Sequence, residues 1–402
     1  MFDLTTFISD FVTKRPDSMF REDLRQNETN LQKKIKGKAV LVIGGAGSIG
    51  SSFIKAVLPY EPCSMVVVDL NENALTELTR ELRSSGSTHL PEDYITYPMD
   101  YASKVFSKMF RARNGFDIVA NFSAHKHVRS EKDIYSIEAL FYNNVINAKK
   151  LLDLLSEFPP EEYFCVSTDK AANPVNIMGA SKRIMEDLIF SYSEKFPVKT
   201  ARFANVAFSN GSLPEGFLKR IEKRQPLSAP CDVKRYFVSP EESGQICLLS
   251  CVLGENREIF FPKLEEESMM SFDKIAVELL KQKGFEPIYC SSEGDALCKM
   301  ELRPAESTQY PVYFSRSDTS GEKTFEEFYT EEERVNFHRF HSLGVVEGKK
   351  PKDLNEIKTF IQGLEELFAG SAAGKEEVVG LIKKYLPNFE HMETGKSLDA
   401  KM

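Results

Sequence analysis

The stretch "VLVIGGAGSIGSSF", residues 40–53, decides the fold of this chain. An apolar run ends in glycine and is followed by small residues and a helical segment, which predicts a strand, a tight turn and a helix. Glycines in a GxxGxxG pattern let the backbone approach a pyrophosphate, and the helix N-terminus offers it N–H groups. The pattern predicts a dinucleotide site at Gly44, Gly47, Ser48, Ile49 and Gly50.

Short apolar runs alternate with amphipathic segments, such as 72–83 and 147–158, between Lys38 and Phe203. This alternation indicates a parallel sheet covered by helices on both faces. We therefore predict a doubly wound α/β domain of the Rossmann type over residues 37–203. Its predicted strands are residues 38–43, 64–69, 94–98, 116–121, 163–167 and 198–203.

The alternation loosens after Phe203, which predicts a smaller substrate-binding lobe over residues 204–345, interleaved with the main sheet. Residues 1–36 are expected to form a helical extension, and residues 346–402 a helical tail. In the lobe we expect helices near 214–224, 240–253 and 271–283 and strands at 258–261 and 311–315.

Composition excludes several classes of function. The net charge of −8 argues against nucleic acid as a partner, because binding to the phosphate backbone needs a basic surface. The seven cysteines are odd in number and scattered, which favours reduced thiols over disulfides or a metal site. No secretory signal and no apolar run of about 18 residues is found. We predict a cytoplasmic protein with neither a metal nor a membrane span.

Asp69 ends the strand that follows the glycine turn. A carboxylate there suits the two ribose hydroxyls of NAD and repels a 2′-phosphate, which favours NAD over NADP. The GxxGxxG spacing resembles that of the extended short-chain dehydrogenase/reductase group. The resemblance implies that Asp100, in "PMDYAS", contacts adenine together with Tyr101, although Asp100 is as readily interpreted as a helix N-cap.

"STDKAANPVNIMGASKR", residues 167–183, raises the question of catalysis. Members of the group carry Tyr-x-x-x-Lys on the helix after the fifth strand, one helical turn apart and on one face. Here the pair is Met178 and Lys182. Lys182 can still hold the nicotinamide ribose, but Met178 cannot transfer a proton. Taken alone, Met178 favours a non-catalytic relative.

Thr168, Asp169 and Lys170 leave the carboxyl end of a parallel strand, where such sheets bind their ligands. An acid and a base at this place can accept a carbon-bound proton and protonate a leaving hydroxyl. Both steps belong to the 4,6-dehydration of a hexose. The alternative is an aspartate that caps the turn beside a solvated lysine.

Four stretches together resemble the UDP-N-acetylglucosamine 4,6-dehydratases of the CapD-like polysaccharide-biosynthesis family, from about Phe20 to Phe328. They are "STDKAANPVNIMGASKR", "AHKHV", "ARFANVAFSNGSLPEGF" and "RYFVSPEES". The resemblance implies Lys170 as the base at carbon 5, Asp169 as the acid at carbon 6 and Thr168 as the residue that orients the sugar hydroxyl. Because a branch of that family also has methionine at the position of Met178, this residue marks a subgroup rather than a loss.

A UDP-sugar brings two phosphate charges, so an acidic protein must gather cations locally. We expect Lys126 and His127 beside the sugar, and Asn205 and Arg235 near the diphosphate and uridine. Lys219 is a weaker candidate, because a solvated helix face explains it as well. The family's late "RPGEK" is replaced by "TSGEK" at 319–323, and Arg303 could supply the lost arginine.

These features predict an NAD-dependent dehydratase of UDP-N-acetylglucosamine that feeds surface glycan or nonulosonic acid synthesis. A nucleotide-sugar 4-epimerase is one alternative, but it has no elimination for Asp169 and Lys170 to catalyse. A non-catalytic NAD-binding protein is the other. Helices that flank this fold commonly pair two subunits, which predicts a homo-oligomer. The configuration at carbon 5, or release of a 5,6-ene, stays open.

Overall fold

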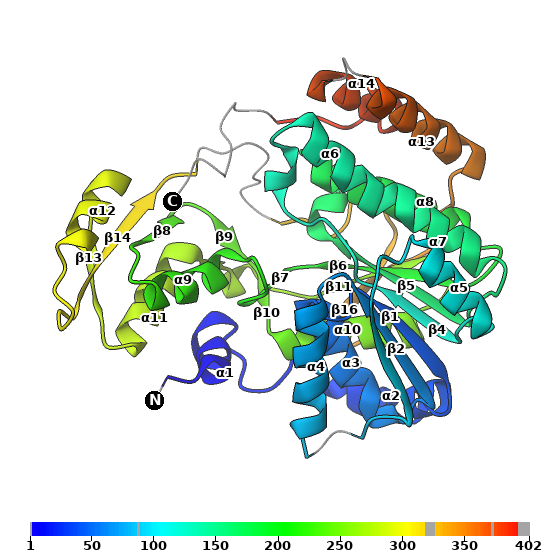
Figure 1. Cartoon of the computed structure of the whole chain (residues 1–402), viewed down its shortest axis with the longest axis horizontal. Helices are drawn as coiled ribbons and strands as arrows, with labels where there is room; N and C mark the ends of the chain where they lie inside the picture. The colour runs from blue at the N-terminus through cyan, green and yellow to red at the C-terminus, as the bar shows by residue number, and fades with distance from the viewer. Residues whose placement is uncertain (1, 87–88, 318–325, 371–373, 393–402) are drawn as a thin grey trace.

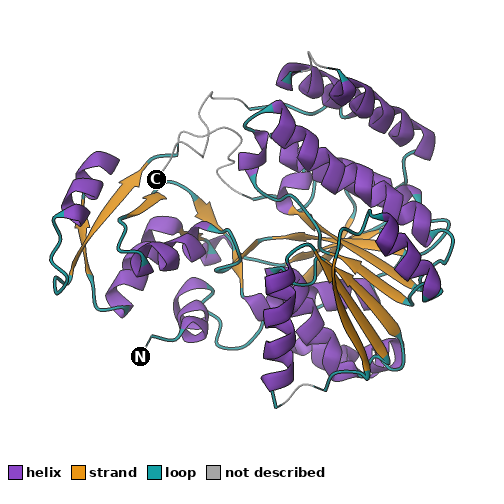
Figure 2. Ribbon diagram, viewed as in Figure 1, coloured by secondary structure: helices purple, strands orange, loops and turns teal. Residues whose placement is uncertain are grey.

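The computed structural model describes residues 2–86, 89–317, 326–370 and 374–392 (Figures 1 and 2). Its centre is a nine-stranded sheet in the order β15-β16-β11-β6-β5-β4-β1-β2-β3. The seven strands from β11 to β3 pair in parallel, and β16 and β15 close that edge in antiparallel pairing. In chain order the strands are β1 (Ala39–Ile43), β2 (Ser64–Asp69), β3 (Asp93–Pro98), β4 (Ile118–Asn121), β5 (Glu162–Thr168), β6 (Val198–Phe203), β11 (Glu258–Pro262), β15 (Val335–Asn336) and β16 (Leu343–Val346).

Helices cover both faces of this sheet, and the predicted doubly wound α/β fold is confirmed (Figure 1). The strands from β16 to β2 are buried along nearly their whole length because both faces are covered, whereas the edge strands β3 and β15 are only partly buried. One face carries α2 (Arg21–Ile35), α3 (Ser48–Val57), α4 (Glu72–Ser84) and α10 (Pro240–Leu253). The other carries α5 (Lys104–Ala112), α6 (Ile134–Phe141), α7 (Asn147–Leu155) and α8 (Ile177–Ser191).

A smaller lobe lies beside the carboxyl ends of the strands (left in Figure 1). It has its own apolar core, to which Phe7 and Val12 near the N-terminus contribute. The strands β11 and β16, from the range 204–345, belong to the main sheet rather than to this lobe. The lobe is built on β8 (Leu227–Pro230), β13 (Glu286–Tyr289) and β14 (Gln309–Ser315), with α9 (Leu213–Glu222), α11 (Phe272–Gln282), α12 (Glu293–Glu301) and, at its edge, α1 (Leu4–Phe7). Short strand pairs connect it to the main domain: β7 (Asn205–Val206) with β10 (Phe237–Val238), and β9 (Lys234–Arg235) with β12 (Met270–Ser271).

The predicted helical tail consists of α13 (Leu354–Ala369) and α14 (Lys375–Tyr385). Both helices lie over α6 and α8 (Figure 1). As a result α8 is enclosed between the sheet and the tail, and most of its residues are buried. Within the described ranges, no helix has the length and apolar composition that crossing a bilayer requires.

The glycine turn has a stereochemical reason for its composition. Gly44 has a φ of +71°, and a Cβ atom there would lie 2.7 Å from the backbone nitrogen of Ser123. A Cβ atom on Gly50 would lie within contact distance of the Gly44 carbonyl and force α3 away from the turn. The two glycines therefore allow β1, α3 and the chain after β4 to meet at one point.

We predict that Gly44→Ala lowers the free energy of unfolding by about 1–3 kcal/mol, because the side chain adds both a strained φ and a backbone clash. Gly380→Ala is the matched control, since nothing lies within 4 Å of its added Cβ atom in α14. The control should gain about 0.5–1 kcal/mol through helix propensity. Urea unfolding measures the free energy of unfolding of both variants. Equal values for Gly44→Ala and Gly380→Ala would contradict the steric argument.

Candidate active site

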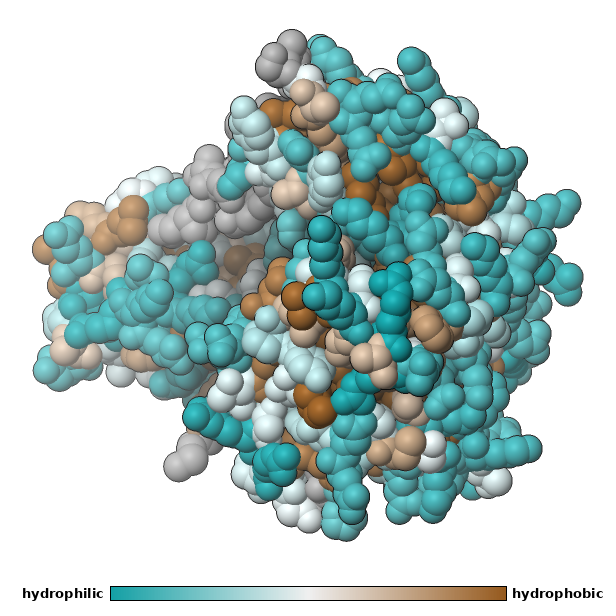
Figure 3. Space-filling view, turned by 45° about the vertical axis from the view of Figure 1, so that its right-hand side comes forward, coloured by the Kyte–Doolittle hydropathy of each residue, from teal (hydrophilic) through white to brown (hydrophobic). Residues whose placement is uncertain are grey.

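A cavity of about 770 Å³ lies where the carboxyl ends of β1, β4, β5 and β6 face the lobe. The surface is hollowed at this place, between the lobe and the larger domain (Figure 3). Parallel sheets bind ligands at this end of their strands. Most of the predicted site residues line the cavity, namely Gly44, Gly47, Ser48, Ile49, Gly50, Lys126, His127, Thr168, Asp169, Lys170, Met178, Lys182, Asn205 and Arg235.

The predicted cofactor residues divide into two groups. The glycine turn and the start of α3 line the cavity, whereas Asp69, Asp100 and Tyr101 are not part of its wall. The Asp69 carboxylate lies beside the turn and accepts hydrogen bonds from the backbone N–H of Ala46 (3.1 Å) and of Asn71 (2.9 Å). It is thereby fixed at the end of β2, with its charge beside the glycine turn.

Asp100 and Tyr101 have different surroundings. Asp100 is exposed, and its carboxylate accepts from the backbone N–H of Ala102 at 2.8 Å. The Tyr101 hydroxyl is buried and donates to the Asn143 carbonyl at 2.8 Å. Burial, with smaller contributions from Cys165 and Asp100, raises the pKa of Tyr101 well above its usual range. The phenol is thus a structural donor within the core.

Met178 and Lys182 lie one turn apart on the face of α8 that meets the cavity. Met178 is only 2% exposed. The Lys182 ammonium is buried and donates to the Val166 carbonyl at 2.7 Å. Burial lowers the pKa of Lys182, with Cys165 and Glu186 opposing the shift. A lysine held in this way can reach from the helix toward the end of β5, where a ribose would lie.

Thr168, Asp169 and Lys170 form one hydrogen-bonded unit at the end of β5. The Thr168 hydroxyl donates to Asp169 Oδ1 at 2.7 Å, and Lys170 Nζ lies 3.1 Å from both carboxylate oxygens. The Asp169 side chain is 7% exposed and that of Lys170 is 27% exposed. A hydroxyl, an acid and a base therefore converge on one point of the cavity wall.

Neighbouring polar contacts fix the position of this unit. Ser167 donates to Glu186 on α8 at 2.7 Å, and Asn176 caps α8 by accepting from the Gly179 N–H at 2.7 Å. The Asn144 side chain accepts a hydrogen bond from the His125 N–H and donates one to the His125 carbonyl. Its amide nitrogen also donates to Ser181 Oγ at 3.0 Å. These bonds connect the loop after β4, the end of β5 and the start of α8.

The predicted sugar residues follow β4. Lys126 extends into the cavity, where desolvation lowers its pKa although Glu215 opposes the shift. The ring of His127 lies against Gly211, where an added Cβ atom would come within 3.0 Å of His127 Nε2. The motif "SNGS" thus leaves room for this imidazole.

At the far wall, Asn205 and Arg235 meet a residue that sequence reasoning missed. Glu326 is 9% exposed, lines the cavity and accepts from the Asn205 amide at 2.5 Å and the Tyr236 N–H at 2.9 Å. Arg235 is buried, and the only hydrogen-bond acceptor found for its guanidinium among the described residues is the Lys234 carbonyl at 2.9 Å. A buried cation in this position suits an anionic ligand. No local motif marks Glu326 in the sequence.

The weaker candidates are less central. Lys219 pairs with Glu215 along α9 and is 59% exposed. Arg303 stacks on Phe285 and Tyr310 at 5.1 and 5.2 Å and is not part of the cavity wall. The segment "TSGEK" at 319–323 lies outside the described residues. Among the described residues, no group of metal-binding side chains comes together.

The family described as "Polysaccharide biosynthesis protein" matches residues 40–347. The chain belongs to this family. Its relatives include the "Uncharacterized membrane protein MJ1061" of Methanocaldococcus jannaschii, 31% identical over 319 residues that cover 77% of this chain and 86% of that protein. The capsular polysaccharide biosynthesis protein CapD of Staphylococcus aureus is 26% identical over 78% of this chain, but the match spans only 51% of CapD.

Sugar-nucleotide enzymes also match this member of the family. A UDP-N-acetylglucosamine 4,6-dehydratase (inverting) of Campylobacter jejuni is 27% identical over 57% of this chain and 67% of its own length. UDP-glucose 4-epimerases of Rickettsia species match at 25% identity. Among solved structures, Pen from Bacillus thuringiensis aligns with a TM-score of 0.63 at 19% identity, over 88% of this chain and 98% of Pen. The chain is therefore related to the dehydratases and epimerases of extended short-chain dehydrogenase type.

The shifted pKa of the buried Glu326 carboxyl group should make the stability of the protein depend on pH. Burial, reinforced by Asp169, raises the pKa of Glu326 from 4.5 to about 7, while Lys170 and Arg235 oppose the shift. Between these two values the unfolded chain loses the proton and the folded protein keeps it, so stability falls as pH rises. Glu326→Gln removes this loss, because Asn205 can turn its amide to pair with glutamine.

We expect the urea midpoint of Glu326→Gln to rise relative to that of the wild type as the pH is raised from about 5 to about 8. Glu222→Gln, at an exposed position of α9, is the control and should follow the wild type. A difference between Glu326→Gln and wild type that does not vary with pH would contradict the assignment.

Proposed function

We propose that the chain is an NAD-dependent nucleotide-sugar 4,6-dehydratase that acts on UDP-N-acetylglucosamine. The observation that carries this proposal is the unit of Thr168, Asp169 and Lys170, in which one carboxylate contacts both a hydroxyl and an amine. An elimination needs a base for a carbon-bound proton and an acid for the leaving hydroxyl. An oxidation and re-reduction at carbon 4 alone would move a hydroxyl proton and a hydride, but it would neither remove a carbon-bound proton as a proton nor expel a hydroxyl.

The glycine turn supports a dinucleotide as the cofactor. Gly44 and Gly50 allow the backbone to pack closely at the turn, and the N-terminus of α3 faces the cavity, where its N–H groups could receive a pyrophosphate. Asp69, at the end of β2, would accept the ribose hydroxyls and disfavour a 2′-phosphate. A bound NAD would supply reversible hydride transfer, which the oxidation at carbon 4 and the reduction at carbon 6 require. Lys182 would hold the nicotinamide ribose, since its ammonium lies at the end of β5.

The contact between Asp169 and Lys170 explains how both required protonation states arise. Transfer of one proton from the ammonium to the carboxylate, over 3.1 Å, would produce a neutral amine and a carboxylic acid. The amine of Lys170 would then take the proton from carbon 5, and the acid of Asp169 would protonate the hydroxyl that leaves carbon 6. Thr168, bonded to the same carboxylate, would orient the 4-hydroxyl, whose proton would leave to an ordered water as the hydride departs from carbon 4. When the hydride returns to carbon 6, the Lys170 ammonium would give its proton back to carbon 5, and the proton released to water would restore the ammonium. Met178 then has no proton to transfer and packs beside the reacting carbons.

The proposal that the substrate is a UDP-sugar is based on the basic side chains that line the cavity. A volume of about 770 Å³ is within the usual range for small-molecule sites. Arg235 is buried in the cavity wall, and its guanidinium, whose charge also acts on Glu326, would bind the diphosphate. Lys126 and His127 also line the cavity and would bind the sugar. The match to a dehydratase of UDP-N-acetylglucosamine supports the choice of sugar.

We predict that the protein removes one water from UDP-N-acetylglucosamine with no net formation of NADH, as mass spectrometry and absorbance would show. Lys170→Ala should lower the rate of this loss by about 10²–10⁴-fold while NAD stays bound, because the base at carbon 5 is gone. Lys150→Ala, at an exposed position of α7, is the control and should keep full activity.

Each other outcome has a meaning. An isomer of unchanged mass would identify an epimerase, and an unchanged sugar would favour a binding protein or another substrate. Full dehydration by Lys170→Ala would show that the base is a different group.

For the cofactor, we predict that Asp69→Asn lowers the affinity for NAD about tenfold, because hydrogen bonds from the ribose to a charged acceptor are lost. The affinity for NADP should rise, since the charge that repels its 2′-phosphate is removed. Titration of the two dinucleotides by calorimetry measures both changes, and Glu77→Ala, at an exposed position of α4, is the control. Parallel changes for the two cofactors would contradict the role of Asp69.

A further inference from the structure

The chain after the main sheet folds back over the helix that carries Met178 and Lys182. We call the described residues from Lys349 to Met392 the C-terminal clamp. Its helices α13 and α14 lie over α6 and α8 (Figure 1). The ring of Phe360 lies 6.3 Å from that of Phe141 on α6, and 4.8 Å from that of Tyr385. The clamp is thus packed on the helices behind the cavity rather than extended into solvent.

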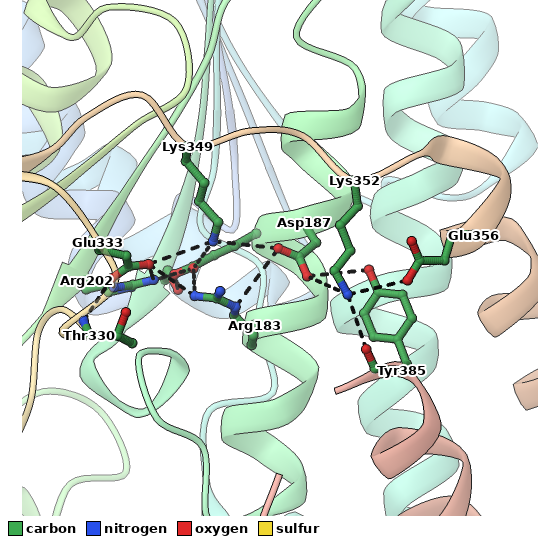
Figure 4. Close-up of polar contacts among 11 residues, drawn as sticks. Arg183, Asp187, Arg202, Thr330, Glu333, Lys349, Lys352, Glu356 and Tyr385 are labelled. Carbon is green, nitrogen blue, oxygen red and sulfur yellow. Dashed lines mark hydrogen bonds and ion pairs between the residues drawn. The ribbon is translucent and has the colours of Figure 1, made fainter. Parts of the chain in front are cut away.

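The clamp supplies cations to two buried carboxylates of α8 (Figure 4). Lys349 Nζ lies 3.5 Å from Glu186 Oε2 and 3.6 Å from Asp187 Oδ1. Lys352 Nζ lies 3.8 Å from Asp187 Oδ2, to which the Tyr385 hydroxyl also donates at 3.4 Å. Removal of these partners would leave negative charge buried on α8. The clamp therefore fixes where α8 lies.

The same carboxylates reach the catalytic strand. Glu186 accepts a hydrogen bond from Ser167, which directly precedes Thr168 at the end of β5. Lys182, one turn earlier on α8, donates to the Val166 carbonyl of the same strand. Movement of α8 would therefore change the geometry of Thr168 and its neighbours.

At its far end the clamp touches the catalytic loop itself. The Met392 N–H donates to the Val175 carbonyl at 2.9 Å. His391 Nε2 lies 3.4 Å from Glu131 Oε2, and the other oxygen of Glu131 accepts from the Met178 N–H at 3.0 Å. The side chains of His391 and Glu131 are 8% and 7% exposed. Glu131 thus links the clamp to the first turn of α8.

This link satisfies groups that would otherwise lack a partner. The first N–H groups of a helix have no acceptor within the helix, and a buried N–H without an acceptor is costly. Glu131 accepts the hydrogen bond of the Met178 N–H through one carboxylate oxygen. Its second oxygen is also buried and therefore needs a hydrogen-bond donor. His391 supplies that donor, so the position of the carboxylate depends on the clamp.

We propose that the C-terminal clamp positions the catalytic stretch from Thr168 to Lys182, with Glu131 and His391 as positioning residues that act through Met178. The clamp holds this stretch from two sides, through Glu186 behind β5 and through Val175 and Met178 in the cavity wall. The kinetic part of the test rests on the proposed dehydratase function, and the exchange part does not.

The test uses the full chain with His391→Ala, and with His391→Gln as the variant that keeps a donor. Hydrogen exchange of the amides from Val175 to Lys182 should be faster in His391→Ala and near wild type in His391→Gln. The kcat for dehydration should fall about tenfold in His391→Ala with little change in KM, because small displacements of reacting groups cost rate rather than binding. His391→Gln should recover most of this loss. His89→Ala, at an exposed loop position, is the control.

Three results would overturn the proposal. They are unchanged exchange in His391→Ala, faster exchange with an unchanged kcat, and faster exchange spread over the whole main sheet, which would indicate general destabilisation. If the wild type dehydrates no sugar nucleotide, the proposed function fails by itself, and the exchange of residues 175–182 still decides whether the clamp orders the loop.

Discussion

The ion pair between Glu186 on α8 and Arg202 on β6 is the interaction around which this structure is built. Both side chains have no exposed surface, and Arg202 donates to both carboxylate oxygens, at 3.0 and 2.8 Å. Burial alone would raise the pKa of Glu186, but Arg202 and Lys349 hold this pKa well below its usual range. Burial would likewise lower the pKa of Arg202, and Glu186 keeps it raised. Neither group can become neutral, so each requires the other.

Four separate parts of the chain meet at this pair. Glu333, beyond the lobe, pairs with Arg202 and with Arg183, while Lys349 approaches Glu186 from the tail (Figure 4). Ser167 extends the network to the end of β5. Since a buried charge cannot be left without its partner, the relative positions of β5, β6, α8 and the tail are coupled. Because Ser167 directly precedes Thr168, these contacts also fix the position of the unit of Thr168, Asp169 and Lys170.

The parts of the fold that were predictable depend on local chemistry. Each parallel strand is a short apolar run, and Gly44 and Gly50 are required by a positive φ and by close backbone approach, so both signals stand in the sequence itself. The same holds for the unit of Thr168, Asp169 and Lys170, because adjacent residues at the end of one strand must lie together. A family resemblance added the roles of these residues, which their spacing alone does not assign.

The parts that were not predictable depend on distant contacts. Glu326 reaches Asn205 and Tyr236 from beyond the lobe, and His391 reaches Glu131 from the tail. Neither has a periodicity or a motif that points to its partner. The resemblance predicts that Tyr101 contacts adenine, but its hydroxyl is turned into the core and donates to the Asn143 carbonyl. Only the packed structure determines such orientations.

The distribution of the cavity wall along the chain has a consequence for biosynthesis. The glycine turn, the loop after β4 and the end of β5 come from the first half of the chain, whereas Arg235 and Glu326 follow much later and Met392 later still. Chains fold from the N-terminus as they leave the ribosome, so the half of the site beside the glycine turn can form first. A growing chain thus contains the residues beside the glycine turn well before it contains Arg235 and Glu326.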